Sequence, residues 1–268
     1  MVKSDELIED GKKIMGNVSE KKVYKFIIFL FLMNLFIAII INTLLIYMGW
    51  SINNTMISHL QLLLKILCHV IPVLYFLRKN KIQFTKLTNR RIEAKILGLP
   101  LFMTILLFLI NTGIASLFEA KIGPPTSAGM STSLSVSAIL LIIIISPIIE
   151  EILFRGILFQ SQITKSITNL VLMNALAFSL FHFNIYQLIP TFLVGVFLTY
   201  VVFIYRNLYL VILLHMIYNS LVIIFSVKTT IMYQLYIMTN YGLLIFFLAL
   251  TTFLLLFAIL IINNRKKI

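Results

Sequence analysis

Charged residues and cysteine are scarce in this sequence, and acidic residues are almost absent from its second half. Only 12% of the 268 residues are charged, whereas 60% are hydrophobic and the mean hydropathy is +1.04. A soluble domain of this length cannot bury so much apolar surface. The single cysteine, Cys68, excludes an internal disulfide, and no CxxC motif or Cys/His cluster predicts structural zinc. The composition therefore predicts a membrane protein.

Hydrophobic runs long enough to cross a bilayer recur along the chain, since a transmembrane helix needs about 20 apolar residues. The candidate spans lie at about 24–49, 57–77, 95–118, 134–160, 167–184, 186–205, 208–227 and 240–263. The fourth run is long for one crossing, which predicts a tilt, a protrusion or a break near Pro147, because proline removes a helical hydrogen bond. The expected fold class is all-α, a polytopic transmembrane helical bundle of about eight spans.

The basic residues, which give a net charge of +13, lie in clusters between these runs. The clusters assigned to the cytoplasm contain Lys3, Lys12, Lys13, Lys21, Lys22 and Lys25, then Arg78, Lys79, Lys81, Lys86, Arg90, Arg91 and Lys95, and finally Arg265, Lys266 and Lys267. The loops assigned to the outside contain only Lys121 and Lys228. This pattern predicts that both termini are cytoplasmic and does not favour nucleic-acid binding. The 78–95 connection is interpreted as a topological anchor, with binding of anionic lipid headgroups as the alternative.

A stretch rich in Gly, Pro and Ser at 123–133 is the clearest loop signal. We expect a cytoplasmic N-terminal segment (1–23), three leading spans with their loops (24–133), a four-span core (134–227), and a last span with a basic tail (228–268). The sequence contains no recognisable internal repeat and no inverted pair of broken helices, which disfavours a transporter.

Glu150 and Glu151 are the only acidic residues after residue 120, and they follow the apolar run 138–149. An ionised carboxylate in hydrocarbon is costly unless it is paired or faces a wet cavity, so such residues indicate a functional site. The structural alternative is an ion pair between Glu151 and Arg155, which share a helix face at i,i+4. Arg155 can neutralise only one of two close carboxylates well. Glu150 is therefore predicted to be a general base, and Glu151 the partner of Arg155.

His182 lies near the end of the fifth predicted span, where a lone histidine is usually an interfacial residue. A hairpin that turns near residue 166 would bring His182 to the depth of Glu150, because each is 16 residues from that turn. Phe178, at i−4 from His182, is expected to pack against the imidazole. We therefore expect the His182 and Glu150 side chains to meet.

The seventh predicted span supplies His215 and Asn219, again at i,i+4 on one face. Their structural interpretation is hydrogen bonding between buried helices, worth about 1 kcal/mol. Their functional interpretation is a pair of donors for an oxyanion. The two remaining histidines, His59 and His69, lie in the second predicted span without acidic neighbours and are interpreted as structural.

Together these residue types predict hydrolysis, because a buried carboxylate and an imidazole can share a water and remove its proton. His215 and Asn219 would stabilise the oxyanion that forms on the attacked carbonyl. The alternative is zinc held by Glu150, His182 and His215, but no HExxH helix is present and the spacing fits no common zinc signature. The metal-free version is favoured.

Three short motifs occur in order on successive predicted spans: Glu150-Glu151-x-x-x-Arg155, Phe178-x-x-x-His182 and His215-x-x-x-Asn219. This set resembles the type II CAAX prenyl endopeptidase family of intramembrane proteases, also called the CPBP (CAAX protease and bacteriocin-processing) or Abi family. The resemblance covers about residues 135–225. It implies water activation by Glu150 and His182, an oxyanion hole of His215 and Asn219, and support from Glu151 and Arg155. The family has been described both as metalloproteases and as glutamate-dependent proteases.

The resemblance also bears on substrate and location. Eukaryotic members trim prenylated CAAX proteins, whereas bacterial members are linked to peptide processing, signalling and self-immunity to bacteriocins. The Ile, Asn and Lys bias predicts a bacterial member in the cell membrane, which implies a substrate other than a CAAX protein. The expected function is an endopeptidase that cleaves a peptide or membrane-associated protein near the cytoplasmic side. The alternatives are a non-catalytic immunity or scaffold protein that binds a peptide, and a transporter that uses Glu150 as a proton or cation site.

Overall fold

The computed structural model describes residues 4–16, 18–47, 54–84, 87, 94–122, 135–226 and 240–264. These residues are almost entirely helical and include no β-strand, as expected for the all-α class. The first part of the chain forms α1 (Ser4–Met15), α2 (Glu20–Tyr47), α3 (Asn54–Lys65), α4 (Ile71–Lys79) and α6 (Ala94–Ile122). The second part forms α7 (Val136–Leu140), α8 (Ser146–Glu151), α9 (Phe159–Ser161), α10 (Ile167–Leu180), α11 (Ile185–Tyr205), α12 (Leu208–Ser226) and α14 (Asn240–Asn263). Three π-helical segments, η1 (Ile66–Val70), η2 (Leu141–Ile145) and η3 (Ile152–Leu158), join consecutive helices into longer rods.

Seven helical stretches among the described residues are long and apolar enough to cross a membrane. They are Glu20–Ile41, His59–Lys79, Leu97–Ala115, Val136–Ser161, Ile185–Tyr205, Leu208–Phe225 and Gly242–Asn263. The chain is therefore a multi-pass membrane protein. The predicted loop at 123–133, Lys228, the tail at 265–267 and much of the 78–95 connection lie outside the described residues.

The fifth predicted span, 167–184, differs from the expectation because α10 ends at Leu180 after 14 residues. At about 1.5 Å per residue this helix reaches only about 21 Å, less than the hydrocarbon core. The chain then turns, with Phe183 in the left-handed region at a φ of 51°. Asn184 begins α11 by accepting a hydrogen bond from the Tyr186 amide. Helix α10 is thus shorter than the other predicted spans, and the chain turns into α11 directly after it.

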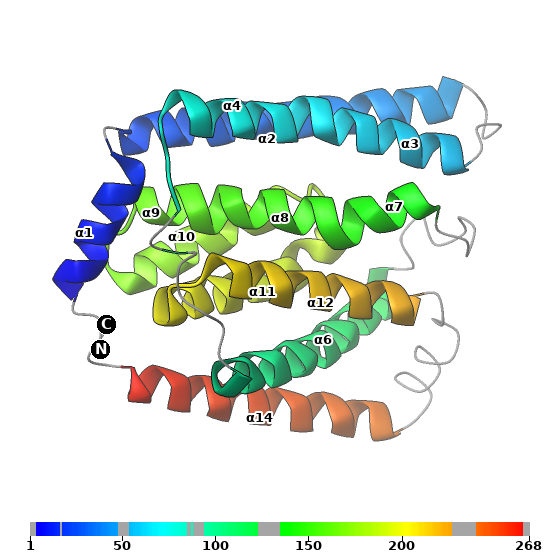
Figure 1. Ribbon diagram of the computed structural model, residues 1–268. Helices are drawn as coiled ribbons and strands as arrows, with labels where there is room; N and C mark the ends of the chain where they lie inside the picture. The colour runs from blue at the N-terminus through cyan, green and yellow to red at the C-terminus, as the bar shows by residue number, and fades with distance from the viewer. Residues whose placement is uncertain are drawn as a thin grey trace.

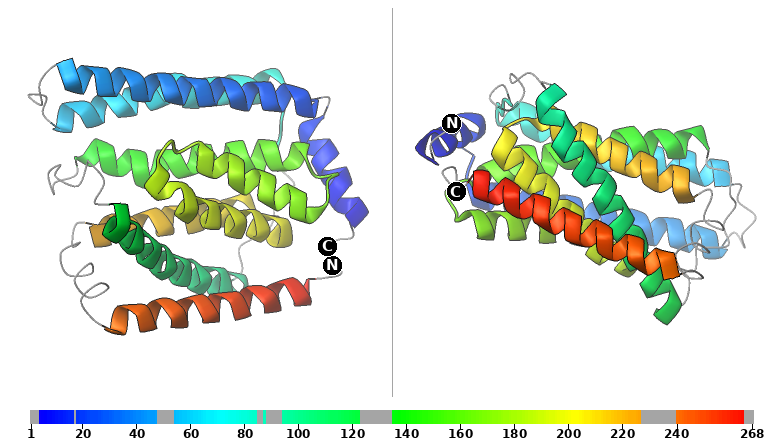
Figure 2. Two further views of the ribbon diagram at one scale, coloured as in Figure 1. Left: turned by 180° about the vertical axis from the view of Figure 1, so that it is seen from behind. Right: turned by 90° about the horizontal axis from the view of Figure 1, so that it is seen from below.

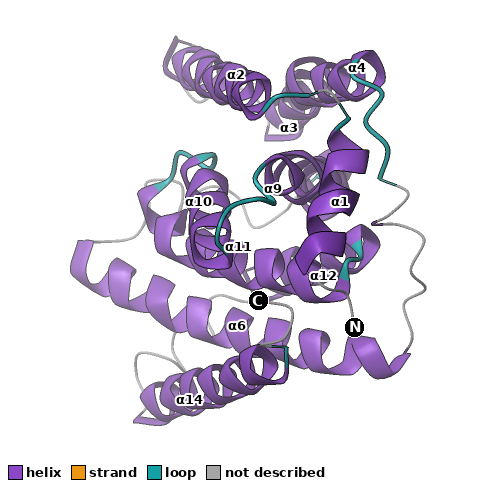
Figure 3. Cartoon of the chain, turned by 90° about the vertical axis from the view of Figure 1, so that its left-hand side faces the viewer, coloured by secondary structure: helices purple, strands orange, loops and turns teal. Residues whose placement is uncertain are grey.

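The helices form layers (Figure 1). Helix α2 and the α3–α4 rod lie along one side, and α6 and α14 lie along the opposite side, with the rod from α7 to α9 and helices α10, α11 and α12 between them. The end-on view in Figure 3 shows the same separation. Helix α1 crosses one end of the bundle, where it packs on α9, and the last turn of α14 lies at that end too (Figure 2). The predicted cytoplasmic side of both termini stays a prediction.

An ion pair ties this end of the bundle together. Lys165, in the turn between α9 and α10, pairs with Glu20 at the first turn of α2 and hydrogen-bonds to the Tyr24 hydroxyl. The hydrogen bond to Glu20 raises the pKa of Lys165, so the ammonium keeps its charge at neutral pH.

Pro147 does not break the fourth span, because η2 precedes it and the helix continues. In this π-helical turn the Ser146 amide donates to the Leu141 carbonyl, five residues earlier. Pro147 has no amide hydrogen for the next carbonyl in that series, Ile142. The side-chain Nδ2 of Asn219 on α12 donates to the Ile142 oxygen instead, at 2.9 Å. Asn219 thereby satisfies the acceptor that proline leaves open.

Helices α10 and α11 pack closely where Gly195 meets Ala175. A Cβ added at Gly195 would lie 2.8 Å from the Ala175 Cα, which is backbone and cannot move away cheaply. Gly195 is also fully buried within α11. A side chain at this position would separate the two helices.

We expect Gly195→Ala to destabilise the protein by about 1–3 kcal/mol, because overpacking forces the backbones apart. Thermal unfolding of the detergent-solubilised protein measures this change. Gly98→Ala in α6 is the matched control, since an added Cβ there meets nothing within 4 Å. Equal stability of the two variants would contradict the close approach of α10 and α11.

Candidate active site

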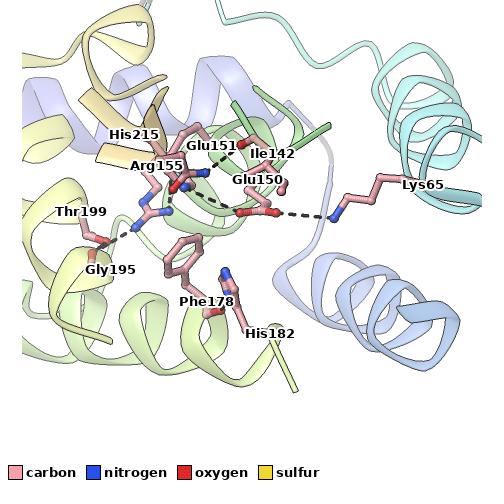
Figure 4. Close-up of polar contacts among 11 residues, drawn as sticks. Lys65, Ile142, Glu150, Glu151, Arg155, Phe178, His182, Gly195, Thr199 and His215 are labelled. Carbon is pink, nitrogen blue, oxygen red and sulfur yellow. Dashed lines mark hydrogen bonds and ion pairs between the residues drawn. The ribbon is translucent and has the colours of Figure 1, made fainter. Parts of the chain in front are cut away.

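The two glutamates lie at the end of α8 and are both buried, with exposed fractions of 7% for Glu150 and 0% for Glu151. Consecutive helical residues point about 100° apart, so the two carboxylates face different neighbours. Figure 4 shows Glu151 directed toward Arg155 and His215, and Glu150 directed toward Lys65. The two side chains therefore belong to separate polar clusters that share one helix turn.

Glu151 is the centre of a buried network. Its Oε1 accepts a hydrogen bond from Arg155 Nη1 at 2.9 Å and another from His215 Nδ1 at 2.8 Å. Neither carboxylate nor guanidinium is exposed. The ion pair expected from the i,i+4 spacing is present, and it extends to a second span through His215. This contact fixes the orientation of the His215 ring.

Arg155 reaches a third helix through its other terminal nitrogen. Its Nη2 donates to the Gly195 carbonyl of α11 at 3.1 Å, and Thr199 Oγ1 donates to the same oxygen at 2.6 Å. The close approach at Gly195 brings this carbonyl within reach of the guanidinium. The packing of α10 on α11 and the placement of Arg155 therefore depend on the same residue.

Phe178 of α10 forms the apolar wall between the clusters. Its ring lies 4.6 Å from Arg155 Cζ, a cation–π distance, and its centroid lies 5.0 Å from that of His182 and 5.7 Å from that of His215. The contact with His182 is the one that the i,i+4 spacing predicts. One aromatic ring thus contacts side chains from η3, from α12 and from the turn after α10.

Glu150 has a different set of neighbours. Its Oε1 lies 3.5 Å from Lys65 Nζ, and its Oε2 lies 4.0 Å from His215 Nε2. It also interacts electrostatically with His182. The expected contact between the Glu150 and His182 side chains therefore stays a prediction, and His182 lies beside Phe178 in Figure 4.

The hydrogen bond of His182 determines which nitrogen is available for chemistry. Its Nδ1 lies 2.9 Å from the Phe178 carbonyl oxygen. A carbonyl can only accept, so Nδ1 carries the hydrogen, and the Nε2 of the neutral ring is left with a lone pair. A neutral His182 can therefore accept a proton at Nε2.

The two expected oxyanion donors are already engaged in hydrogen bonds. His215 Nδ1 donates a hydrogen bond to Glu151, because a carboxylate can only accept. The Nε2 atom of His215 can donate at the same time only when the ring is doubly protonated. Asn219 uses one amide hydrogen on the Ile142 carbonyl, which leaves its second hydrogen. Both the structural and the functional interpretation of this pair therefore remain compatible with the contacts.

The sequence pattern did not single out Lys65, and it gave His69 a structural role, which nothing in the described part of the structure contradicts. Lys65 ends α3 inside the second membrane stretch, and the rule that singled out Glu150 applies equally to an intramembrane lysine. His69 also interacts electrostatically with Lys65 and Glu150. No short-range pattern could pair these residues with Glu150, because 85 residues separate Lys65 from Glu150 along the chain.

The proposed zinc ligands do not converge as a metal site requires. Among the described residues no group of three or more His, Cys, Asp and Glu side chains is arranged to hold a metal ion. Glu150, His182 and His215 therefore do not fit a zinc site in this arrangement.

Comparison with known proteins gives one family. Residues 132–221 match the family described as type II CAAX prenyl endopeptidase Rce1-like. This segment, referred to below as the Rce1-like domain, is similar to the domain of that family. The family is a protease family, which supports a protease here, and the matched region contains Glu150, His182, His215 and Asn219. Lys65 and His69 lie outside it. No curated protein and no solved structure matches the chain.

Removing one charge of the buried Glu151–Arg155 pair should destabilise the protein. We expect Arg155→Met to lower stability by about 3–5 kcal/mol, because it leaves the Glu151 carboxylate buried without its cation. The double variant Glu151→Leu/Arg155→Met removes both charges and should lose less. Thermal unfolding of the wild type, of the single variants Arg155→Met and Glu151→Leu, and of the double variant measures the coupling. A double variant that loses as much as the sum of both singles would contradict a direct pair.

Proposed function

We propose that this protein is an intramembrane endopeptidase in which Glu150 and His182 activate a water molecule that attacks a peptide carbonyl. The Rce1-like domain at 132–221 supports a protease. The geometric support comes from His182, whose bond to the Phe178 carbonyl leaves Nε2 as a proton acceptor near the buried Glu150 carboxylate.

In the first step, a water between Glu150 and His182 transfers a proton to one of these bases as its oxygen bonds to the substrate carbonyl carbon. The carbonyl π electrons move onto oxygen and form an oxyanion. Proton transfer by a positioned base contributes typically about 10²–10⁴-fold to the rate. The apolar wall of Phe178 strengthens these interactions because it limits competing water.

The oxyanion needs donors that are fixed before the reaction. His215, held by Glu151, would donate from Nε2 when the ring is doubly protonated, and Asn219 would donate its second amide hydrogen. When the intermediate collapses, the carbon–nitrogen bond breaks. The proton taken from water then passes to the departing amine.

Glu151 and Arg155 would act through position rather than chemistry, because their contacts hold His215 and join three helices. We infer a bacterial cell-membrane protein with both termini cytoplasmic. Its substrate would be a peptide or membrane-associated protein cleaved near the cytoplasmic side.

Glu150→Gln and His182→Ala should each lower kcat/KM by about 10²–10⁴-fold, because each removes a proton acceptor. Cleavage of a quenched fluorescent library of apolar peptides by the purified protein measures this loss. His59→Ala, an exposed position on α3, is the matched control and should keep full turnover. Unchanged cleavage by a correctly folded Glu150→Gln protein would rule out this mechanism and favour a peptide-binding role.

The proposal favours a metal-free mechanism. We expect turnover to survive prolonged dialysis against EDTA, with metal analysis showing less than one zinc per chain in the active protein. Activity that is lost on dialysis and restored by added zinc would contradict this version.

A further inference from the structure

A second polar cluster lies on the far side of Glu150 from Arg155. It consists of Lys65 at the end of α3, His69 in η1, and Phe181 at the end of α10. Lys65 Nζ lies 5.9 Å from the centre of the Phe181 ring, and the His69 ring meets the same ring edge-on at 5.8 Å. An ammonium and an imidazole thus pack on the same aromatic ring, and both interact electrostatically with Glu150.

The buried His69 ring lacks hydrogen-bond partners among the described residues. Its side chain is 1% exposed, and neither ring nitrogen has a hydrogen-bond partner among the described residues. A buried polar group left without a partner costs about 1–3 kcal/mol. The neutral ring has one donor and one acceptor. The ring also interacts electrostatically with the Lys65 ammonium, so an anionic partner of the donor would be attracted by that charge as well.

Lys65 is only loosely engaged. Within the described part of the chain its acceptor is Glu150 Oε1 at 3.5 Å, longer than the usual range of about 2.7–3.2 Å for an N–H···O bond. An ammonium has three donors, so Lys65 can take further acceptors. Its side chain is 14% exposed, unlike the fully buried Arg155. Arg155 is therefore built into the fold, whereas Lys65 can exchange partners.

We propose that Lys65 and His69 form a subsite that binds a carboxylate of the peptide substrate beside Glu150. This inference rests on the proposed protease function and assigns to it a substrate feature. A carboxylate offers four lone-pair positions, enough for the ammonium and the His69 donor together. When Lys65 turns to the substrate, Glu150 loses its counter-charge and is free to receive the proton of the water.

A lysine is tolerated inside this membrane stretch because the Glu150 carboxylate lies beside it. A substrate carboxylate that binds to Lys65 replaces Glu150 as its anionic partner. The subsite comes from α3 and η1, which lie outside the Rce1-like domain, so it would be a contribution of the leading helices.

Binding of matched peptides tests the subsite without turnover. The probes are a dansylated apolar pentapeptide as the free acid and the same peptide as the C-terminal amide, added to full-length Glu150→Gln protein in nanodiscs. This background blocks cleavage and removes the competing carboxylate. We expect the acid to bind about tenfold more tightly than the amide, because a buried charge gains a charged partner.

Adding Lys65→Met to this background should bring the ratio of dissociation constants to unity, and Lys65→Arg should restore part of the preference. His69→Phe keeps the ring but removes its nitrogens and should weaken the preference severalfold. The matched controls are Lys79→Met, which removes an exposed lysine of α4, and His59→Phe, an exposed position on α3. Both should keep the preference.

A third probe, an amide peptide with a glutamate side chain at its last position, separates the two sources of a carboxylate. If it binds like the acid and depends on Lys65, the subsite accepts any carboxylate of the substrate. If it binds like the plain amide, the subsite accepts the C-terminal carboxylate.

Equal binding of acid and amide to the Glu150→Gln protein, or a preference unaffected by Lys65→Met, would overturn the subsite. Because binding is measured without cleavage, a chain that prefers the acid but cleaves nothing contradicts the protease and not the subsite. A chain that cleaves peptides without the acid preference contradicts the subsite alone.

Discussion

The ion pair between Glu151 and Arg155 holds the candidate site together, because three helical segments meet through it. The carboxylate takes His215 from α12, and the guanidinium takes the Gly195 carbonyl from α11. Burying two charges is expensive, and their attraction offsets this cost only when further hydrogen bonds satisfy them. The helices cannot shift relative to one another without breaking such bonds. Rigidity at this point places Phe178, and through it His182, beside Glu150.

The adjacent Glu150 is placed for chemistry because it lacks such a network. Its nearest cation, Lys65, is held at 3.5 Å by a helix from the other half of the chain. The two neighbouring carboxylates thus have different cations. Glu151 pairs with the buried Arg155 of the Rce1-like domain, whereas Glu150 lies near Lys65, which comes from outside that domain and can change partners. A site of this kind can keep its shape through Glu151 while the state of Glu150 changes with its ligand. The role of the leading helices would then extend beyond anchoring the domain in the bilayer.

Much of this arrangement follows from local pattern. The apolar runs mark each membrane stretch, because an uninterrupted apolar helix of that length is stable nowhere else. The i,i+4 spacing of Glu151 with Arg155, and of Phe178 with His182, predicts contacts that a single helix enforces. Pro147 was harder to interpret, since proline can tilt, break or bulge a helix. The outcome depended on Asn219, a residue of another span that accommodates the free carbonyl of Ile142.

The sequence by itself determined the membrane class, the all-α fold and the candidate polar residues of the 132–221 segment, because these depend on composition and on the helical repeat. Only the tertiary structure decided how those residues combine. It shortened α10 through the turn at Phe183, turned the donors of His215 and Asn219 toward Glu151 and Ile142, and brought Lys65 and His69 to Glu150. Such contacts join positions far apart along the chain, so they depend on how helices pack, and no periodicity within one helix encodes that.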